Sequence, residues 1–315
     1  KTGGAAATGA PMQLADPEPF WESLPFSPTG AQRRAVGEIL ADMAGETSMN
    51  RLLQGDVGSG KTLVALMSML LAVDNGFQAC MMAPTEILAR QHYATVCKML
   101  DGMDVKVAVL TGASKARERR ASLEGIASGE VDILIGTHAL IEDDVTFARA
   151  GLVVCDEQHR FGIAQRAKLL RACPRAHMLV MSATPIPRTL SLVFYGDLDV
   201  TTITDKPKSR QEISTSIIPQ SRYEDMLDYI GGEVKKGRQA YFVCAKIDGG
   251  DDEDDDGSII SVKERYEELK QRLPAVKFAL LHGRMKDKEK DEVMTAFKNG
   301  EYDCLVSTTV IEVGV

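Results

Sequence analysis

One segment constrains the fold of this chain more than any other, residues 51–62, which read Arg-Leu-Leu-Gln-Gly-Asp-Val-Gly-Ser-Gly-Lys-Thr. An apolar strand enters Gly-x-x-x-x-Gly-Lys-Thr, and an apolar helical run follows at 63–73. In this context the turn wraps around phosphates, which its backbone N–H groups and the positive end of the helix bind. The segment therefore predicts a nucleoside triphosphate site, built from Gly55, Asp56, Val57, Gly58, Ser59, Gly60, Lys61 and Thr62. Lys61 would reach the β- and γ-phosphates, and the Thr62 hydroxyl would bind Mg²⁺.

A second motif follows the apolar run at 152–155, where Asp156 and Glu157 stand at the end of an expected strand. Phosphoryl transfer needs a group that holds the metal and a group that positions the attacking water. We assign the first role to Asp156, which would share Mg²⁺ with Thr62, and the second to Glu157. The expected catalytic set is therefore Lys61, Asp156 and Glu157. An acidic turn without chemical function is the alternative, and the preceding phosphate-binding segment makes it the weaker one.

Several further loops combine small and hydroxyl residues at the ends of expected strands. Backbone N–H groups and threonine hydroxyls in such loops bind nucleic-acid phosphates without reading bases. The alternative for each is a helix cap. With only 5% aromatic residues, the chain favours backbone contact over base stacking. The candidate nucleic-acid contact residues, which the resemblance given below assigns to DNA, are Pro84, Thr85, Thr111, Gly112, Gly136, Thr137, His138, His282, Gly283, Arg284 and Thr308. The Ser182–Thr184 turn would sense the γ-phosphate, whereas His92 and His177 are expected to be packing residues.

Apolar runs and helical runs alternate along the chain, which is typical of parallel sheets covered on both faces. The expected fold class is α/β with two parallel-sheet domains. Residues 1–20 are expected to be a flexible lead-in, 21–205 the ATP-binding domain and 206–315 a second, incomplete domain. Strands are expected at 50–54, 79–83, 105–110, 131–135, 152–155, 177–181, 213–218, 240–245, 276–281 and 303–307. Helices are expected at 62–73, 86–100, 115–128, 165–171, 222–235, 263–272 and 286–298.

Composition narrows the class of protein. With 44% hydrophobic and 26% charged residues and no apolar run of about 18, the chain reads as globular and without a membrane span. Six cysteines without a Cys-x-x-Cys pair favour buried free thiols in a reducing cytoplasm. The net charge of −8 argues mildly against nonspecific nucleic-acid binding. The acidic run at 251–256, which biases that sum, is interpreted as a solvated loop.

The order of these motifs resembles superfamily 2 helicases and translocases. The strings 52–62, 83–89, 156–162 and 181–190 are similar to the RecG family of bacterial branched-DNA helicases. The resemblance implies two RecA-like domains and ATP-driven movement along double-stranded DNA, with remodelling of stalled forks and Holliday junctions in recombination and repair. It assigns Gln32 to adenine contact. It assigns Gln158, His159, Ser182 and Thr184 to coupling of hydrolysis to motion.

Two departures from the RecG pattern carry expectations of their own. From the 315 residues we expect neither the wedge domain that splits the branch nor the later arginine that completes the ATP site. Such an arginine contributes about 10³–10⁵ in rate where it has been measured, so this chain alone is expected to bind Mg·ATP and to turn it over poorly. A monomer in the cytoplasm is expected, with branched DNA and a single-strand-binding protein as partners and no membrane association.

Two other functions stay open at this point. One is a transcription-repair coupling translocase, the nearest related family, which usually has Phe at the position of Ser59 and Glu at that of Gln158. The other is a nucleotide-switched binding module that does not cycle. Glu157 argues against the second, because a pure switch needs no carboxylate to position water.

Overall fold

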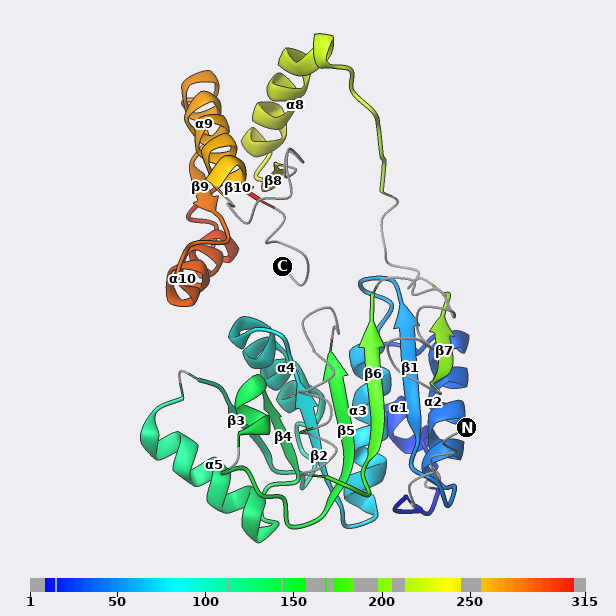
Figure 1. The fold of residues 1–315 in the computed structure, drawn as a ribbon. Coiled ribbons are helices and arrows are strands. Elements are labelled where there is room, and N and C mark those ends of the chain that lie inside the picture. The colour runs from blue at the N-terminus through cyan, green and yellow to red at the C-terminus, as the bar shows by residue number, and fades with distance from the viewer. Residues whose placement is uncertain are drawn as a thin grey trace, which may run out of the picture. The chain divides into compact units, whose positions relative to one another are not determined.

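The computed structural model describes residues 9–14, 16–112, 114–142, 144–156, 168, 173–183, 198–205, 213–244 and 256–308. The chain divides into two compact units, Lys1–Gln211 and Glu212–Val315, which are described separately (Figure 1).

The first unit is built on a parallel sheet of seven strands in the order β3-β4-β2-β5-β6-β1-β7. The strands are β1 (Asn50–Gly55), β2 (Gln78–Met82), β3 (Val107–Leu110), β4 (Ile133–Gly136), β5 (Ala150–Asp156), β6 (His177–Ser182) and β7 (Asp199–Ile203). β2, β4 and β6 are buried along their whole length, as expected of strands covered on both faces. The arrowheads of β1, β5 and β6 point the same way in Figure 1, so the loops that follow these strands share one edge.

Helices cover both faces of this sheet. They are α1 (Glu18–Ser23), α2 (Gly30–Met43), α3 (Lys61–Asp74), α4 (Glu86–Met99) and α5 (Ala116–Ser128), with a short 3₁₀ helix η1 (His138–Ile141). Successive strand residues point to opposite faces, and Leu53 packs in the core that includes residues of α2, α3 and α4. Its neighbour Leu52 packs in the second core, together with Ile126 of α5.

The expected flexible lead-in is wrong for residues 9–14 and 16–20. The Gly9 N–H donates to the carbonyl of Glu46, and Met12, Phe20 and Trp21 are buried in the core of the first unit. The few large apolar side chains among the glycines and alanines of this stretch give it enough buried surface to stay ordered.

Strand β7 was also missed by the sequence analysis. Its sequence, Asp-Val-Thr-Thr-Ile, alternates exposed and buried positions only weakly, because it is an edge strand paired to β1 alone.

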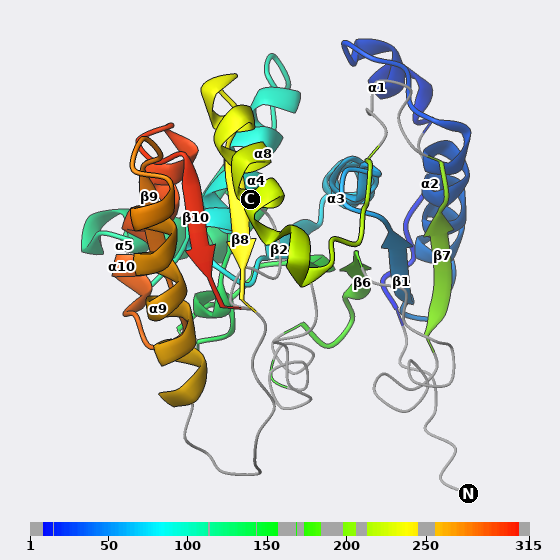
Figure 2. The same ribbon diagram turned by 90° about the horizontal axis from the view of Figure 1, so that it is seen from above.

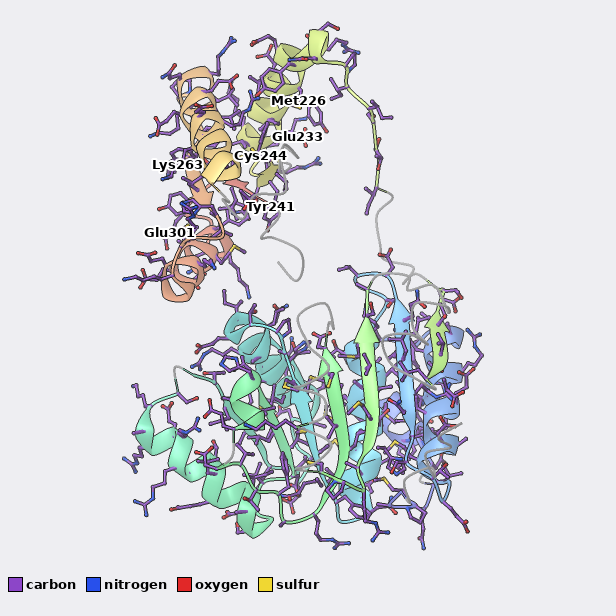
Figure 3. All side chains as sticks on the ribbon, in the orientation of Figure 1. Met226, Glu233, Tyr241, Cys244, Lys263 and Glu301 are labelled. Carbon is purple, nitrogen blue, oxygen red and sulfur yellow. The ribbon has the colours of Figure 1, made fainter. Side chains whose placement is uncertain are left out.

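The second unit has a parallel sheet of three strands in the order β8-β10-β9, which lie side by side in Figure 2. The elements are α8 (Tyr223–Lys235), β8 (Ala240–Val243), α9 (Asp256–Arg272), β9 (Phe278–Leu281), α10 (Asp287–Lys298) and β10 (Cys304–Ser307), preceded by the 3₁₀ helix η3 (Gln220–Arg222). Met226 and Cys244, labelled in Figure 3, pack against one core, and Phe297 lies in the other.

The strand expected at 213–218 is not formed. Among the described residues no strand pairs with this segment, and Ile213 and Ile217 are 75% and 99% exposed. Its β-prone sequence therefore stays extended without a ladder, since strand formation needs a hydrogen-bonded neighbour.

Candidate functional site

The predicted phosphate-binding segment forms a tight loop between β1 and α3. Gly60 caps α3 with φ of 84°, and Gly58 has φ of 77°, a left-handed region that glycine adopts without steric cost. A Cβ atom on Gly55 would lie 2.6 Å from the Ser59 Oγ. The loop therefore needs glycine at these positions, as a backbone that closes around phosphates does.

Lys61, the first residue of α3, folds back over this loop. Its Nζ donates to the carbonyl oxygens of Gly55 at 2.7 Å and Asp56 at 3.0 Å. The Ser59 N–H donates to the Asp56 carbonyl at 3.1 Å. The two bonds of Lys61 hold its ammonium group at the loop, where a phosphate-binding lysine has to act.

Gln32 lies directly against the same loop. Its Nε2 donates to the Ser59 carbonyl at 2.8 Å, and its Oε1 accepts the N–H of Thr29 at 2.8 Å. Thr29 and Gln32 form a capping box at the start of α2, so the helix cap orients the glutamine. Its expected contact with adenine stays a prediction.

Asp156 and Ser182 are the last residues of β5 and β6, the two strands that follow next to β1 in the sheet. Ser182 pairs in register with Gln54, one residue before Gly55, and both Asp156 and Ser182 are buried. The carboxyl ends of three adjacent strands thus bring together the phosphate-binding loop, the predicted metal ligand and the predicted sensor turn. Four other predicted residues lie outside the described part of the chain: Glu157, Gln158, His159 and Thr184.

His92 belongs to this site, although the sequence analysis expected a packing residue. Its Nε2 lies 2.5 Å from the Asp156 Oδ2, and each side chain is only 11% exposed. No motif at residue 92 indicates this contact. Only its position two turns into the helix after Pro84-Thr85 could have directed attention to it. His177 is a packing residue as expected, bonded to Met49 N–H and the Ala10 carbonyl.

The other predicted loops of the first unit follow β3, β4 and β2, which are also neighbours in the sheet. Thr85 accepts the N–H of Leu88 at 3.3 Å, so it does cap α4. Thr111 donates from Oγ1 to the Glu86 carboxylate at 3.1 Å. A Cβ atom on Gly136 would lie 2.1 Å from the carbonyl of residue 110. Pro84, Gly112, Thr137 and His138 lie in the same three loops, with the His138 side chain exposed.

In the second unit, the loops after β9 and β10 lie beside each other, since the two strands are paired. The Thr308 N–H donates to the Leu281 carbonyl at 3.3 Å. Burial lowers the pKa of His282, and the cations of Lys263, Arg284 and Lys290 lower it further. Gly283 and Arg284 of this loop are exposed. Three cations therefore lie near the His282 ring, together with the Glu289 carboxylate, which acts on this pKa in the opposite direction. Cations at this loop suit an anionic ligand.

The residues available for Mg²⁺ are the Thr62 hydroxyl and the Asp156 carboxylate. Both are hard oxygen donors, the type that Mg²⁺ prefers, so they fit the expected ion. The described residues contain no group of three His, Cys, Asp or Glu side chains placed to hold a metal by themselves.

Burial raises the pKa of Cys80, and it raises that of Cys173 to about 11, so these free thiols stay protonated at neutral pH.

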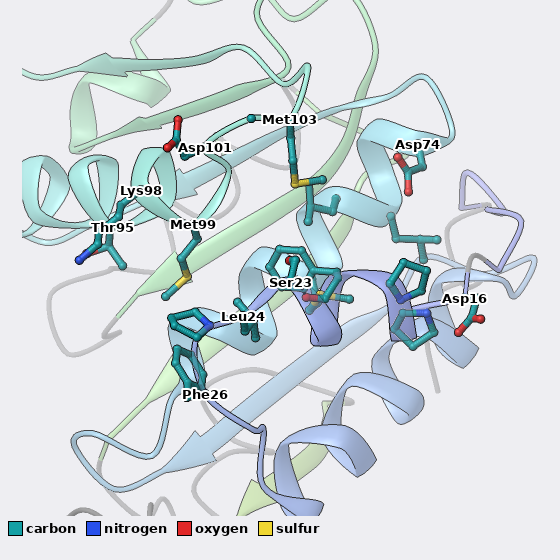
Figure 4. A pocket seen from close by; sticks show the side chains of 18 of the residues that line it. Asp16, Ser23, Leu24, Phe26, Asp74, Thr95, Lys98, Met99, Asp101 and Met103 are labelled. Carbon is teal, nitrogen blue, oxygen red and sulfur yellow. Dashed lines mark hydrogen bonds between the residues drawn. The ribbon is translucent and has the colours of Figure 1, made fainter.

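A cavity of about 860 Å³ lies elsewhere in the first unit (Figure 4). Its lining comes from α1 and the segments on either side of it, from α2, α3 and α4, and from the segment after α4. It is largely apolar, with Phe20, Met67, Met99 and Met103 among the residues. None of the predicted site residues lines it.

Among the described helices, none combines the length and apolar character of a membrane span.

Comparison with known proteins gives family matches in both units of the chain. The DEAD/DEAH box helicase family model matches residues 29–193, and the helicase conserved C-terminal domain model matches 221–315. ATP-dependent DNA helicase RecG of Thermotoga maritima is 48% identical over 299 residues, which are 95% of this chain and 38% of that protein. RecG of a Staphylococcus epidermidis strain is 47% identical over 94% of this chain and 43% of that protein.

Among solved structures, RecG bound to a three-way DNA junction is 44% identical, with a TM-score of 0.83, over 98% of this chain and 40% of that one. A DNA-bound DUF1998 helicase, MrfA, is 17% identical with a TM-score of 0.66 and supports the fold alone. The expected α/β class with two RecA-like domains and the resemblance to RecG are confirmed. The chain spans about two fifths of the length of these RecG relatives.

Proposed function

This chain belongs to the DEAD/DEAH box helicase family, and from that premise we propose that it forms the ATP-driven motor of a RecG-type helicase that acts on branched double-stranded DNA. The observation that carries the proposal is that two groups of loops lie at one edge of the sheet, at the carboxyl ends of its strands. β5, β6 and β1 end in the nucleotide residues, whereas β3, β4 and β2 end in loops suited to phosphate contact. The RecG bound to a three-way junction supports branched DNA as the substrate.

In this proposal the nucleotide residues act by position and charge. Backbone N–H groups of the loop at 55–60 bind the triphosphate, and the Lys61 ammonium neutralises the β- and γ-phosphates. Thr62 and Asp156 would hold Mg²⁺, which supplies further charge neutralisation when bound. Glu157 orients the attacking water, and Gln32 contacts adenine. Gln158, His159, Ser182 and Thr184 couple the state of the nucleotide to motion.

The DNA contacts come from both units. Loops 83–85, 111–112 and 136–138 of the first unit, and 282–284 with Thr308 of the second, bind backbone phosphates and leave the bases unread. Alternating grip by the two sets advances the motor along the duplex. We place this activity in recombination and repair in the cytoplasm, carried out by a monomer with a single-strand-binding protein as a partner.

The test is ATP turnover by the full-length protein that carries this sequence, with and without a synthetic three-way junction. We expect the junction to stimulate turnover more than linear duplex of equal length. Lys61→Ala should reduce turnover by at least about 10²-fold, as loss of charge stabilisation at a phosphoryl-transfer site does. Lys98→Ala, at a position in the lining of the separate cavity, serves as the matched control and should retain activity. Wild-type turnover by Lys61→Ala would overturn the site assignment, and turnover indifferent to any DNA would overturn the helicase function.

A further inference from the structure

We propose that His92 is a positioning residue that connects Asp156 of the nucleotide site to the DNA-contact loops through helix α4. The inference deepens the proposed function and rests on it. Three observations support it: the contact between His92 and Asp156, the attachment of the start of α4 to two of the DNA-contact loops, and the packing of α4 on the sheet.

The first observation is the contact itself. His92 Nε2 lies 2.5 Å from Asp156 Oδ2, and both side chains are shielded from water. A charge-assisted hydrogen bond of this length is strong, and it sets the direction of the carboxylate. Residues that orient metal ligands in this way typically change metal affinity or activity by about 10–100-fold when they are replaced.

The second observation concerns the start of the same helix. Thr85, a candidate DNA-contact residue, is the N-cap of α4. Glu86, the first helical residue, accepts the hydroxyl of Thr111 from the neighbouring loop. Two of the three DNA-contact loops of the first unit are therefore fastened to the start of α4.

The third observation is the path that α4 takes. The helix packs on β3 and β4, the strands farthest in this sheet from the phosphate-binding loop. His92 nevertheless reaches the end of β5, on the far side of β2. His92 is six positions after Glu86, about 9 Å along a helix, so both residues belong to one continuous helical segment. A displacement of the loops by DNA must then move His92 relative to Asp156.

A histidine that only satisfies a buried carboxylate would affect stability alone. A connecting residue affects how strongly DNA and nucleotide influence each other's binding, which is a coupling between two sites. The distinguishing quantity is the ratio of the dissociation constants of a non-hydrolysable ATP analogue without and with saturating three-way junction, at fixed Mg²⁺. The Mg²⁺ concentration for half-maximal analogue binding is the second quantity.

The experiment uses the full-length protein and four variants. His92→Ala removes the bond, His92→Asn keeps a polar side chain that is too short to reach, and His92→Gln keeps an N–H donor at similar reach. Gln91→Ala, at the exposed neighbouring position on α4, is the matched control. For the wild type we expect a ratio in the range of about 5–150, which is usual for coupled sites.

His92→Ala and His92→Asn should bring this ratio close to one and raise the required Mg²⁺ about 10-fold, while affinity for DNA alone changes less than about threefold. His92→Gln and Gln91→Ala should keep the wild-type ratio. A wild-type ratio that survives in His92→Asn overturns the inference and leaves the proposed function intact. A ratio of one in the wild type overturns the proposed coupling of ATP to DNA, and the inference with it.

Discussion

At the scale of single residues, two glycines decide what the phosphate-binding loop tolerates. Gly58 and Gly60 both have left-handed backbones, which cost an alanine about 1–2 kcal/mol. A Cβ atom on Gly58 meets nothing within 4 Å, whereas one on Gly60 would lie 2.2 Å from the Nε2 of Gln32. Only the second substitution also displaces Gln32 from its bond to Ser59.

We therefore expect Gly60→Ala to lower the free energy of unfolding by about 1 kcal/mol more than Gly58→Ala does, since it breaks one further buried hydrogen bond. Urea denaturation of both variants measures the difference. Equal losses would show that the contact between Gln32 and Ser59 contributes nothing to stability.

The buried His177 makes the stability of the first unit depend on pH. Burial lowers the pKa of His177 below the ordinary value of about 6.5. Its Nδ1 accepts the N–H of Met49, so the ring is neutral in the folded protein. The unfolded chain binds a proton more readily. The stabilisation is therefore complete above about pH 6.5 and is lost as the pH falls from there toward the lowered pKa.

Between pH 7.5 and 5.5, we expect the wild type to lose stability more steeply than His177→Gln, which has no titrating ring. Thermal unfolding across this range compares the two slopes, and the smaller absolute stability of the variant does not affect the comparison. Identical slopes would contradict the assignment of this pH dependence to His177.

At the scale of elements, the start of α2 links secondary structure to the nucleotide site. Thr29 accepts the N–H of Gln32 at 3.2 Å, and Asp205, two residues after β7, accepts the N–H of Ala31 at 2.9 Å. Two of the N–H groups that a helix leaves unpaired at its start are thereby satisfied, and Gln32 is held against Ser59.

Replacement of the cap should destabilise the first unit. We expect Thr29→Ala to lower the free energy of unfolding by about 1 kcal/mol, and Thr29→Ser, which keeps the hydroxyl, to stay near the wild type. Urea denaturation separates the two. If Thr29→Ser loses as much as Thr29→Ala, the methyl group rather than the cap is responsible.

At the scale of the whole molecule, DNA affinity has to come from local charge, because the net charge is −8. Each phosphate neutralised by a cation contributes about −0.9 to the slope of log affinity against log salt. Arg284→Gln should reduce this slope by about one. Arg272→Gln, whose side chain is paired with Glu224, should not. Fluorescence anisotropy with a three-way junction at several salt concentrations measures both, and a flat salt dependence of the wild type would contradict the phosphate contacts.

The sequence by itself determined the features that depend on neighbours along the chain. The phosphate-binding loop was predicted because its chemistry lies within one continuous segment. Most strands and helices were predicted to within about two residues, for example α5, expected at 115–128 and found at Ala116–Ser128. Local periodicity and capping carry this information. Helix α1 was not expected, and α9 begins at Asp256, seven residues before its expected start. Strand β7 and the segment at 213–218 were also wrongly predicted, because a strand forms only where a neighbouring strand is present to pair with it.

Only the tertiary structure decided which of these segments meet. The strand order places Asp156 and Ser182 beside the phosphate-binding loop, and it brings His92 to Asp156 across 64 positions of the chain. Gln32 reaches Ser59 in the same way, across 27 positions. Such contacts depend on how parallel strands are ordered within the sheet, and the connecting helices allow many orders with the same local patterns. The motifs therefore identified the chemistry, and the packing of the sheet determined how its parts are joined.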